Sequence, residues 1–451
     1  MSGSSHRTHG SSASYADISA RHATDNHFIK VTSGYQLGRD GADPNIIISI
    51  SLANGTIDLL PDPNILLRLP PVTRRNLKTE SFTTRRTGGF TSLTASLSCA
   101  TLAVVIVGVG LDASLQLSFS ELRRAAQEAE RLGFESLWTP GSGVPDPFHV
   151  CAAWAEDTSL RTGISVVPAA RMWTPVALAI QAATLGQLSS GRFVLGLGTG
   201  GYGQKFWESL GLPNRPIAVM RDYVTTVRQL LSGDTVTYDG PAIRLDGVSI
   251  GVHDLPPIPI YLAAIGPQML KLSGECADGT LLNWATPTRI AESRALIAEG
   301  AQRVGRDPSA HVISMYIHVC IDSDALRARR ALGVQVLRYA MGHDDDPAVA
   351  RNRGQLYRGL FAQMGFEDVL SELEDRRDRG ASTGELIDAA PDELFQAVGY
   401  FGTAAEAPSA YARLSAGLDE AVVRIVTVRR GLEPVIEAME ALTPTRVNAA
   451  V

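Results

Sequence analysis

The chain has 451 residues, of which 45% are hydrophobic, 20% charged and 6% aromatic. These proportions predict a soluble globular protein and exclude collagen, coiled-coil and disulfide-scaffold classes. The 41 basic and 47 acidic residues give a net charge of −6, so no basic excess indicates nucleic acid or a membrane surface as a partner.

The four cysteines lie far apart, without a CxxC pair or a Cys/His pair at zinc spacing. Four of the nine histidines fall within the first 27 residues, and the others are scattered singly. We therefore expect no metal site. We also expect a cytoplasmic protein, because nothing in the cysteine pattern indicates disulfides.

Residues 1–100 differ in composition from the rest of the chain. Serine, threonine, arginine and glycine dominate, and no helical apolar period persists. The apolar run Ile46–Leu52 is typical of a strand, but a single strand is unstable alone, so we expect a largely disordered extension. A twin-arginine export signal is the alternative, since Arg85 and Arg86 precede the apolar stretch 90–110. The position of this pair far from the start of the chain favours the extension.

From residue 104 onward, short apolar runs alternate with segments of helical period. The first helix is marked at both ends, by a capping-box pattern at Ser118 and Glu121 and by a left-handed stop at Gly133. The runs expected as strands are 104–110, 134–139, 161–167, 192–197, 258–263, 279–283, 312–321 and 421–428. The expected helices are 118–132, 175–188, 218–232, 267–277, 288–304 and 433–442, with a hairpin-like excursion at 235–248.

Eight strands, each followed by helical sequence, predict an α/β fold of the (β/α)8 TIM barrel type over residues 101–445. A polar, largely helical insertion of about 90 residues precedes the eighth strand. In such barrels the chemistry takes place at the carboxyl ends of the strands, and this rule selects the candidate residues.

Two glycine-containing motifs follow the fourth and fifth expected strands. The run at 196–201 (GLGTGG) matches part of a dinucleotide fingerprint, with Asp222 at about the expected acidic spacing. A Rossmann domain would open with this unit, whereas here three strands precede it. We therefore interpret these glycines as turning the chain, or as letting a flat ring or a phosphate approach the backbone. The Gly-Pro-Gln at 266–268 begins a helix, where free amides and the helix dipole favour an anion.

Four stretches carry a family resemblance: AAQEAERLGFESLWTP (125–140), QAATLGQLSSGRFVLGLGTG (181–200), IYLAAIGPQMLKLSGECADG (260–279) and EGAQRVGRDPSAHVISMYIHV (299–319). They closely resemble the luciferase-like flavin and deazaflavin oxidoreductases. The last stretch is most similar to the branch that uses the deazaflavin coenzyme F420, including methylenetetrahydromethanopterin reductase. The resemblance runs from about 104 to 443 and implies a barrel of the bacterial luciferase-like type.

The resemblance implies a cofactor ring held edge-on near the ends of the third and fourth strands. In many members a non-proline cis peptide backs the ring, and its position maps to Ser165–Val167. The residues thereby assigned to cofactor binding are Gly110, Ser165, Val166, Val167, Gly198, Thr199, Gly200, Ala264 and, as phosphate contacts, Gly266, Pro267 and Gln268. One position departs from the family. Some deazaflavin members have Asp-His after the second strand, where this chain has Thr139-Pro140, so sugar-phosphate dehydrogenase activity is not expected.

Hydride transfer depends more on positioning than on protein nucleophiles, but a proton donor can still be required. Asp112 follows the first strand, and Asp146 and His149 follow the second, so these are the candidate catalytic residues. Each also has a structural interpretation. Asp112 suits a loop cap, Asp146 suits a turn before Pro147, and a single histidine is commonly a surface group.

Other side chains at the same end of the barrel are candidates for contacts with the cofactor. Trp138 and Trp284 end the second and sixth strands and would wall the ring pocket, although core packing is the better interpretation for Trp138. Arg171, Arg215 and Lys271 would meet the anionic tail of the deazaflavin, with solvated surface charge as the alternative.

We expect a coenzyme F420-dependent oxidoreductase that transfers a hydride between the deazaflavin and a small organic substrate. A deazaflavin does not readily activate oxygen, so the enzyme would be a dehydrogenase or reductase. The alternative is an FMN-dependent monooxygenase that works with a separate flavin reductase. A third hypothesis, favoured by the missing Asp-His pair, is a barrel that binds flavin without catalysis. The resemblance implies a homodimer, and no nucleic-acid or membrane partner is expected.

Overall fold

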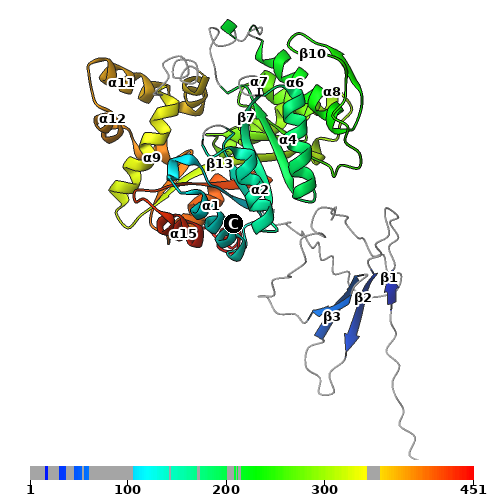
Figure 1. Ribbon diagram of the computed structural model, residues 1–451. Helices are drawn as coiled ribbons and strands as arrows, with labels where there is room; N and C mark the ends of the chain where they lie inside the picture. The colour runs from blue at the N-terminus through cyan, green and yellow to red at the C-terminus, as the bar shows by residue number, and fades with distance from the viewer. Residues whose placement is uncertain are drawn as a thin grey trace, which may run out of the picture. The chain divides into compact units, whose positions relative to one another are not determined.

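A computed structural model describes residues 105–450, apart from 142–143, 170–172, 201–207, 210, 212–214 and 343–355, together with the backbone of four earlier strands (Figure 1). The chain divides into two compact units, Met1–Ala100 and Thr101–Val451. The four strands of the first unit form an antiparallel sheet in chain order: β1 (Ala16–Ile18), β2 (Lys30–Gln36), β3 (Asn45–Leu52) and β4 (Gly55–Leu59). The run expected as a strand at 46–52 lies in β3. The rest of 1–100, for which we expected disorder, lies outside the described residues. So do Arg85 and Arg86, on which the export-signal alternative depends.

Eight parallel strands close into a barrel in the second unit. In chain order they are β5 (Ile106–Gly110), β6 (Ser136–Thr139), β7 (Arg161–Pro168), β8 (Phe193–Gly198), β11 (Ile260–Ala263), β12 (Gly279–Asn283), β13 (Val312–Ile321) and β15 (Glu420–Val426). Neighbouring strands pair in this order, and pairing of β15 with β5 closes the ring. The prediction of a (β/α)8 barrel is confirmed.

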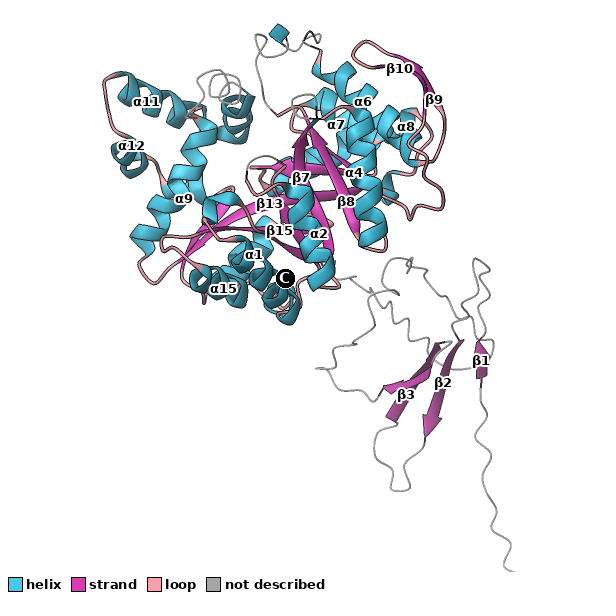
Figure 2. Cartoon of the chain, in the orientation of Figure 1, coloured by secondary structure: helices cyan, strands magenta, loops and turns pink. Residues whose placement is uncertain are grey.

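Helices surround the barrel (Figure 2). They are α1 (Phe119–Arg131), α2 (Pro147–Asp157), α4 (Pro175–Leu188), α6 (Pro216–Leu231), α7 (Pro267–Cys276), α8 (Pro287–Arg303), α15 (Leu432–Ala441) and α16 (Pro444–Asn448). Six of these begin with proline, which suits a first helical position that needs no amide donor. The capping box of Ser118 and Glu121 is present as predicted. Among the described residues, no helix is long and apolar enough to cross a membrane.

The sequence pattern predicted the hairpin between the fourth and fifth barrel strands but not the helix after the second. The expected hairpin is confirmed as β9 (Val236–Asp239) and β10 (Arg244–Val248). Helix α2 was not predicted, because its sequence PFHVCAAWAED is apolar on several faces and lacks a clear helical period. Its ends are nevertheless defined, since Asp146 caps the first turn and Pro147 occupies the first position.

The predicted helical insertion follows β13 and is seen at one side of the barrel in Figure 1. It contains α9 (Ala325–Ala340), a π-helical turn (Ala362–Phe366), α11 (Glu367–Asp378), α12 (Thr383–Ala389), α13 (Asp392–Gln396) and α14 (Ala407–Leu414). A short strand that the sequence did not indicate, β14 (Gly399–Gly402), pairs in parallel with the end of β13. The strand extends the sheet beyond the barrel and fixes the insertion to it.

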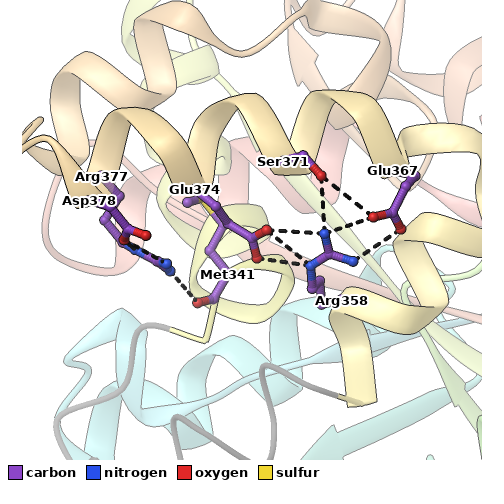
Figure 3. Close-up of polar contacts among 7 residues, drawn as sticks. All are labelled: Met341, Arg358, Glu367, Ser371, Glu374, Arg377 and Asp378. Carbon is purple, nitrogen blue, oxygen red and sulfur yellow. Dashed lines mark hydrogen bonds and ion pairs between the residues drawn. The ribbon is translucent and has the colours of Figure 1, made fainter.

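Ion pairs hold the insertion together. Arg358 donates to the carboxylates of Glu367 and Glu374 at 2.9 Å each, as Figure 3 shows. These hydrogen bonds raise the pKa of Arg358, so the guanidinium stays charged. An apolar cluster under the helices joins Trp284 and Cys320 of the barrel to side chains of α9 and α11. The insertion is therefore packed onto the carboxyl-end side of β12 and β13.

Candidate active site

The barrel interior is filled by one inward-facing cluster. Its buried members are Trp138, Val194, Tyr261, Leu281, Tyr316 and Val422, with Val166 packed against them. Because side chains alternate along a strand, residues two positions further on face the same axis, one layer nearer the carboxyl ends. For β11, β12, β13 and β15 these residues are Ala263, Asn283, His318 and Arg424. This upper layer is polar on the β12–β15 side of the barrel.

Asp112 and Arg424 form an ion pair at the mouth of the barrel. Asp112, predicted as catalytic, is 7% exposed and also accepts a hydrogen bond from the Ser114 amide at 2.7 Å, so it caps a short 3-10 turn as well. The Arg424 guanidinium lies over the Tyr316 ring, 5.2 Å from its centroid. Asp112 raises the pKa of Arg424 against the opposing effect of burial. The pair places a compensated charge beside the barrel axis.

Tyr316 links this pair to β5 and β7. A Cβ atom on Gly110 would lie 2.6 Å from the Tyr316 ring, so glycine is required there for the ring to fit. A hydrogen bond with Ser165 lowers the pKa of the Tyr316 hydroxyl, but burial raises it by more, so the phenol is neutral. Predicted residues Gly110 and Ser165 thus meet on a side chain that the sequence analysis did not select.

Strand β7 carries a bulge with a cis peptide between Ser165 and Val166, inside the range that the family resemblance indicated. The bulge needs glycine on the next strand. A Cβ on Gly196 would lie 2.1 Å from the Ile164 carbonyl, and one on Gly198 would lie 2.6 Å from Val166. The 196–201 run is therefore explained first by packing against this bulge. Val166 faces the barrel interior, whereas Val167 packs in the outer core.

A second polar region lies at the beginning of α7. Gly266 is its N-cap and no side chain caps the amides there, and a Cβ on Gly266 would have open space around it. Gln268 shares a cavity of about 530 Å³ with Arg215 and Arg221, at the beginning of α6. Arg221 also pairs with Glu275 at 2.6 Å, so the free amides of the helix start and the Arg215 guanidinium are the main groups that favour an anion there.

Several other predicted residues have structural partners. Lys271 pairs with Glu299 at 2.7 Å, and Ala264 packs in the outer core. Thr199 and Gly200 follow β8 and are half-buried. Asp222 accepts hydrogen bonds from the Tyr238 hydroxyl at 2.7 Å and from two amides of the β9–β10 hairpin, which explains the acidic residue without a dinucleotide. Arg171 lies outside the described residues.

Asp146 and His149 form a pair of their own at the start of α2. Asp146 accepts hydrogen bonds from the Phe148 and His149 amides, and its carboxylate lies 2.8 Å from the His149 imidazole. The His149 side chain is 79% exposed. Among the described residues, no hydrogen bond or ion pair joins this pair to the Asp112–Arg424 pair. The structure therefore gives both residues a helix-capping arrangement and leaves their catalytic role a prediction.

Both tryptophans are fully buried. Trp138 fills the barrel interior and donates from Nε1 to Glu420 at 3.0 Å, which agrees with core packing. Trp284 stacks on His318 with 3.8 Å between ring centroids and 10° between planes. Among the described residues, no three His, Cys, Asp or Glu side chains gather as a metal site would need.

The sequence analysis missed Asn283, Tyr316, His318 and Arg424. A usable signal existed for three of them. His318 and Tyr316 alternate within the predicted strand 312–321, and Arg424 interrupts the apolar run AVVRIVTV. A polar residue in the carboxyl half of a buried barrel strand is expected to point toward the barrel axis, where the active site lies.

Comparison with known proteins identifies the family. Residues 101–421 match the model of the luciferase-like monooxygenase family. The chain belongs to this family. A 5,10-methylenetetrahydromethanopterin reductase of Methanolobus tindarius is 31% identical over 283 residues, which are 58% of this chain and 85% of that protein. A putative coenzyme F420-dependent oxidoreductase of Mycobacterium tuberculosis is 29% identical over 318 residues, 63% of this chain and 86% of the relative.

The fold is shared with a solved structure of that branch. The coenzyme F420-dependent tetrahydromethanopterin reductase of Methanopyrus kandleri superposes with a TM-score of 0.59 and 23% identity. The superposition covers 76% of this chain and 99% of that chain. This likeness concerns the barrel fold.

Proposed function

We propose that this protein is an oxidoreductase that uses coenzyme F420 and transfers a hydride between the deazaflavin and a small organic substrate. The observation that carries the proposal is the bulge of β7. The bulge brings Val166 to the barrel interior, with glycine on the facing strand. Names of two of the relatives reported above include this coenzyme.

The residues present fit such a coenzyme. Its ring would lie against Val166 near the mouth of the barrel. Gly110 and Gly198 have no side chains there, where a Cβ would contact Tyr316 or Val166. Its phosphate would be held by the uncapped amides of Gly266 and Gln268, with Pro267 between them supplying no N–H. Arg215 and Arg221 line the adjoining cavity and would take the negative charge that continues beyond the phosphate.

When bound, the deazaflavin supplies a ring carbon that accepts or donates hydride. The protein's part is positioning and charge. Arg424 places a positive charge at the barrel mouth, and Asp112 holds it in place and neutralises it. The neutral Tyr316 hydroxyl keeps Ser165, and with it the bulge, in position. Asp112, Asp146 and His149 remain our candidates for moving a proton.

A second candidate function is an FMN-dependent monooxygenase supplied by a separate flavin reductase. The family description itself favours it, since the matching family is that of luciferase-like monooxygenases. A barrel that binds flavin without turnover is the third hypothesis. Oxygen consumption with reduced FMN, compared with anaerobic reoxidation of the reduced deazaflavin, separates the three.

We also propose a homodimer. Helix α4 is apolar on most faces and exposes Ile180 and Leu188, which are 48% and 40% accessible. Burying such side chains against a second copy is favourable at roughly 25 cal/mol per Å². Light scattering of the full chain should give twice the 48.1 kDa mass of one copy. A mass of one copy would contradict the dimer.

The anion-binding arrangement provides a direct test of the proposed cofactor. Arg215→Gln should weaken binding of coenzyme F420 about three- to tenfold, since it removes one charged partner of an exposed anion. Arg244→Gln is a matched control, because this exposed arginine lies on β10 and pairs with Asp239. Equal affinity in the wild type and Arg215→Gln would contradict the assignment of the cavity.

A further inference from the structure

His318 occupies a distinctive place at the carboxyl end of the barrel. Tyr316, two residues earlier on β13, belongs to the inward-facing cluster. Alternation therefore turns His318 toward the same axis, one layer nearer the mouth. It is 1% exposed, and its register partner on β15 is Arg424. A polar ring is thus buried at the level where substrates of barrel enzymes bind.

Three hydrogen-bonding atoms around this ring have no partner among the described residues. They are Nδ1 of His318, Nε1 of Trp284 and Oδ1 of Asn283. A buried polar atom without a partner costs about 1–3 kcal/mol, and such atoms are rare in folded proteins. Three of them at the adjoining ends of β12 and β13 indicate a group that the protein itself does not supply.

Trp284 holds the imidazole in one orientation. The two rings stack with their centroids 3.8 Å apart, and the tryptophan is fully buried. Its backbone has a φ of 55°, in the left-handed region that non-glycine residues seldom occupy. Burial lowers the pKa of His318 well below its ordinary value, so the ring is neutral.

The insertion supplies an aromatic wall beside the stacked pair. Tyr339 of α9 and Phe361 lie 5.3 and 6.5 Å from Trp284, measured between ring centroids. The Asn283 amide donates to the Tyr357 hydroxyl at 3.2 Å, so the insertion also fixes the orientation of Asn283. An apolar or aromatic body would pack well against this wall.

The charge of the region excludes an anionic ligand. Arg424 is the charged group whose field reaches His318, and Asp112 neutralises it. The three unpaired atoms comprise a donor on Trp284, an acceptor on Asn283 and a neutral imidazole nitrogen. A hydroxyl group can satisfy a donor and an acceptor together. A carboxylate or phosphate only accepts, and it would face the Asn283 oxygen.

We propose that His318, with Trp284 and Asn283, recognises the oxygen of an uncharged substrate that carries a hydroxyl group on an apolar body. This inference rests on the proposed function, because it places the substrate at the same barrel mouth as the coenzyme. His318 contacts the substrate oxygen, and the insertion determines which apolar bodies fit.

Binding of two probes that share the same apolar ring tests the inference without turnover. Calorimetric titration of the full chain should show cyclohexanol binding at least tenfold more tightly than cyclohexanecarboxylate. His318→Leu should weaken cyclohexanol binding about tenfold, the factor for one lost hydrogen bond with its partner left unpaired. His318→Gln, which keeps a donor and an acceptor, should bind within about threefold of the wild type. His253→Leu, at an exposed histidine between β10 and β11, is the matched control.

The outcomes separate this inference from the proposed function. Preference for the carboxylate, no measurable binding of cyclohexanol to the wild type, or unchanged binding in a folded His318→Leu would overturn the inference. Trp284→Phe keeps a stacking ring and removes one donor, so it decides the question if His318→Leu does not fold. Coenzyme F420 titrated into the same samples should bind wild type and His318→Leu within twofold. Failure of every protein to bind it would refute the proposed function, while the cyclohexanol result would still decide on His318.

Discussion

Replacing Glu420 with alanine should destabilise the barrel and leave the coenzyme site intact. Glu420 begins β15 at the amino end of the barrel and is fully buried. Its Oε1 accepts hydrogen bonds from Ser136 at 2.5 Å and Trp138 at 3.0 Å, and it pairs with Arg161 at 2.6 Å. Alanine would leave the Arg161 charge without its partner and the buried Ser136 hydroxyl without its acceptor, whereas Trp138 would keep its hydrogen bond to Ser136 at 3.0 Å.

The size of the effect follows from burial. Removing one partner of a buried ion pair costs about 3–5 kcal/mol. The second unit has about 350 residues. At roughly 2.1 cal/mol/K per residue its unfolding entropy is about 0.7 kcal/mol/K, so a loss of about 4 kcal/mol lowers Tm by about 5 °C. Binding of coenzyme F420 should stay within twofold, because the substitution lies at the opposite end of the strands.

Thermal unfolding followed by circular dichroism measures this shift. Glu433→Ala is the matched control, since Glu433 is exposed in the first turn of α15 and its loss should move Tm by less than about 1 °C. The double variant Arg161→Met with Glu420→Leu should recover most of the lost stability, because it leaves no buried charge without a partner. A Tm for Glu420→Ala within 1 °C of wild type would refute the reasoning.

Three further predictions concern pH, packing and domain organisation. Burial lowers the pKa of His311 from 6.5 to about 4, so the unfolded chain binds the extra proton and stability is lost as pH falls from about 6.5 toward 4, by roughly 2 kcal/mol at pH 5. His311→Gln should therefore show a flatter dependence of Tm on pH in that window, and an unchanged slope would contradict this. Gly196→Ala would place a Cβ 2.1 Å from the Ile164 carbonyl and should abolish folding or coenzyme binding, while Gly384→Ala, with its nearest neighbour at 4.0 Å, should do neither. A chain of residues 101–451 should bind the coenzyme within twofold of the full chain in a fluorescence titration, and loss of binding would overturn the proposed boundary near residue 100.

The barrel could be predicted because its strands are buried on both faces. The run 104–110 is continuously apolar, the run 312–321 is mostly so, and Gly133 marks the end of a helix. Helix α2 escaped prediction because its buried apolar residues lie on several faces and show no clear helical period. Strand β14 (GYFG) escaped because four residues carry no period and the strand pairs with β13 across some 80 residues of chain.

The site was only partly predictable, for a different reason. Gly110, Ser165 and Val166 follow from strand ends and from the family resemblance. Which glycine serves packing and which serves a ligand depends on the neighbour across the barrel, and the sequence does not show that neighbour. The contact of Gly110 with Tyr316 is an example. The stack of Trp284 on His318 is likewise a tertiary contact between two strands.

The central claim is tested most directly by equilibrium titration of the full chain with coenzyme F420 and, separately, with FMN, followed by fluorescence. We predict micromolar or tighter binding of the deazaflavin and at least tenfold weaker binding of FMN. Preference for FMN, accompanied by oxygen consumption when a flavin reductase is added, would contradict the account and establish the monooxygenase alternative.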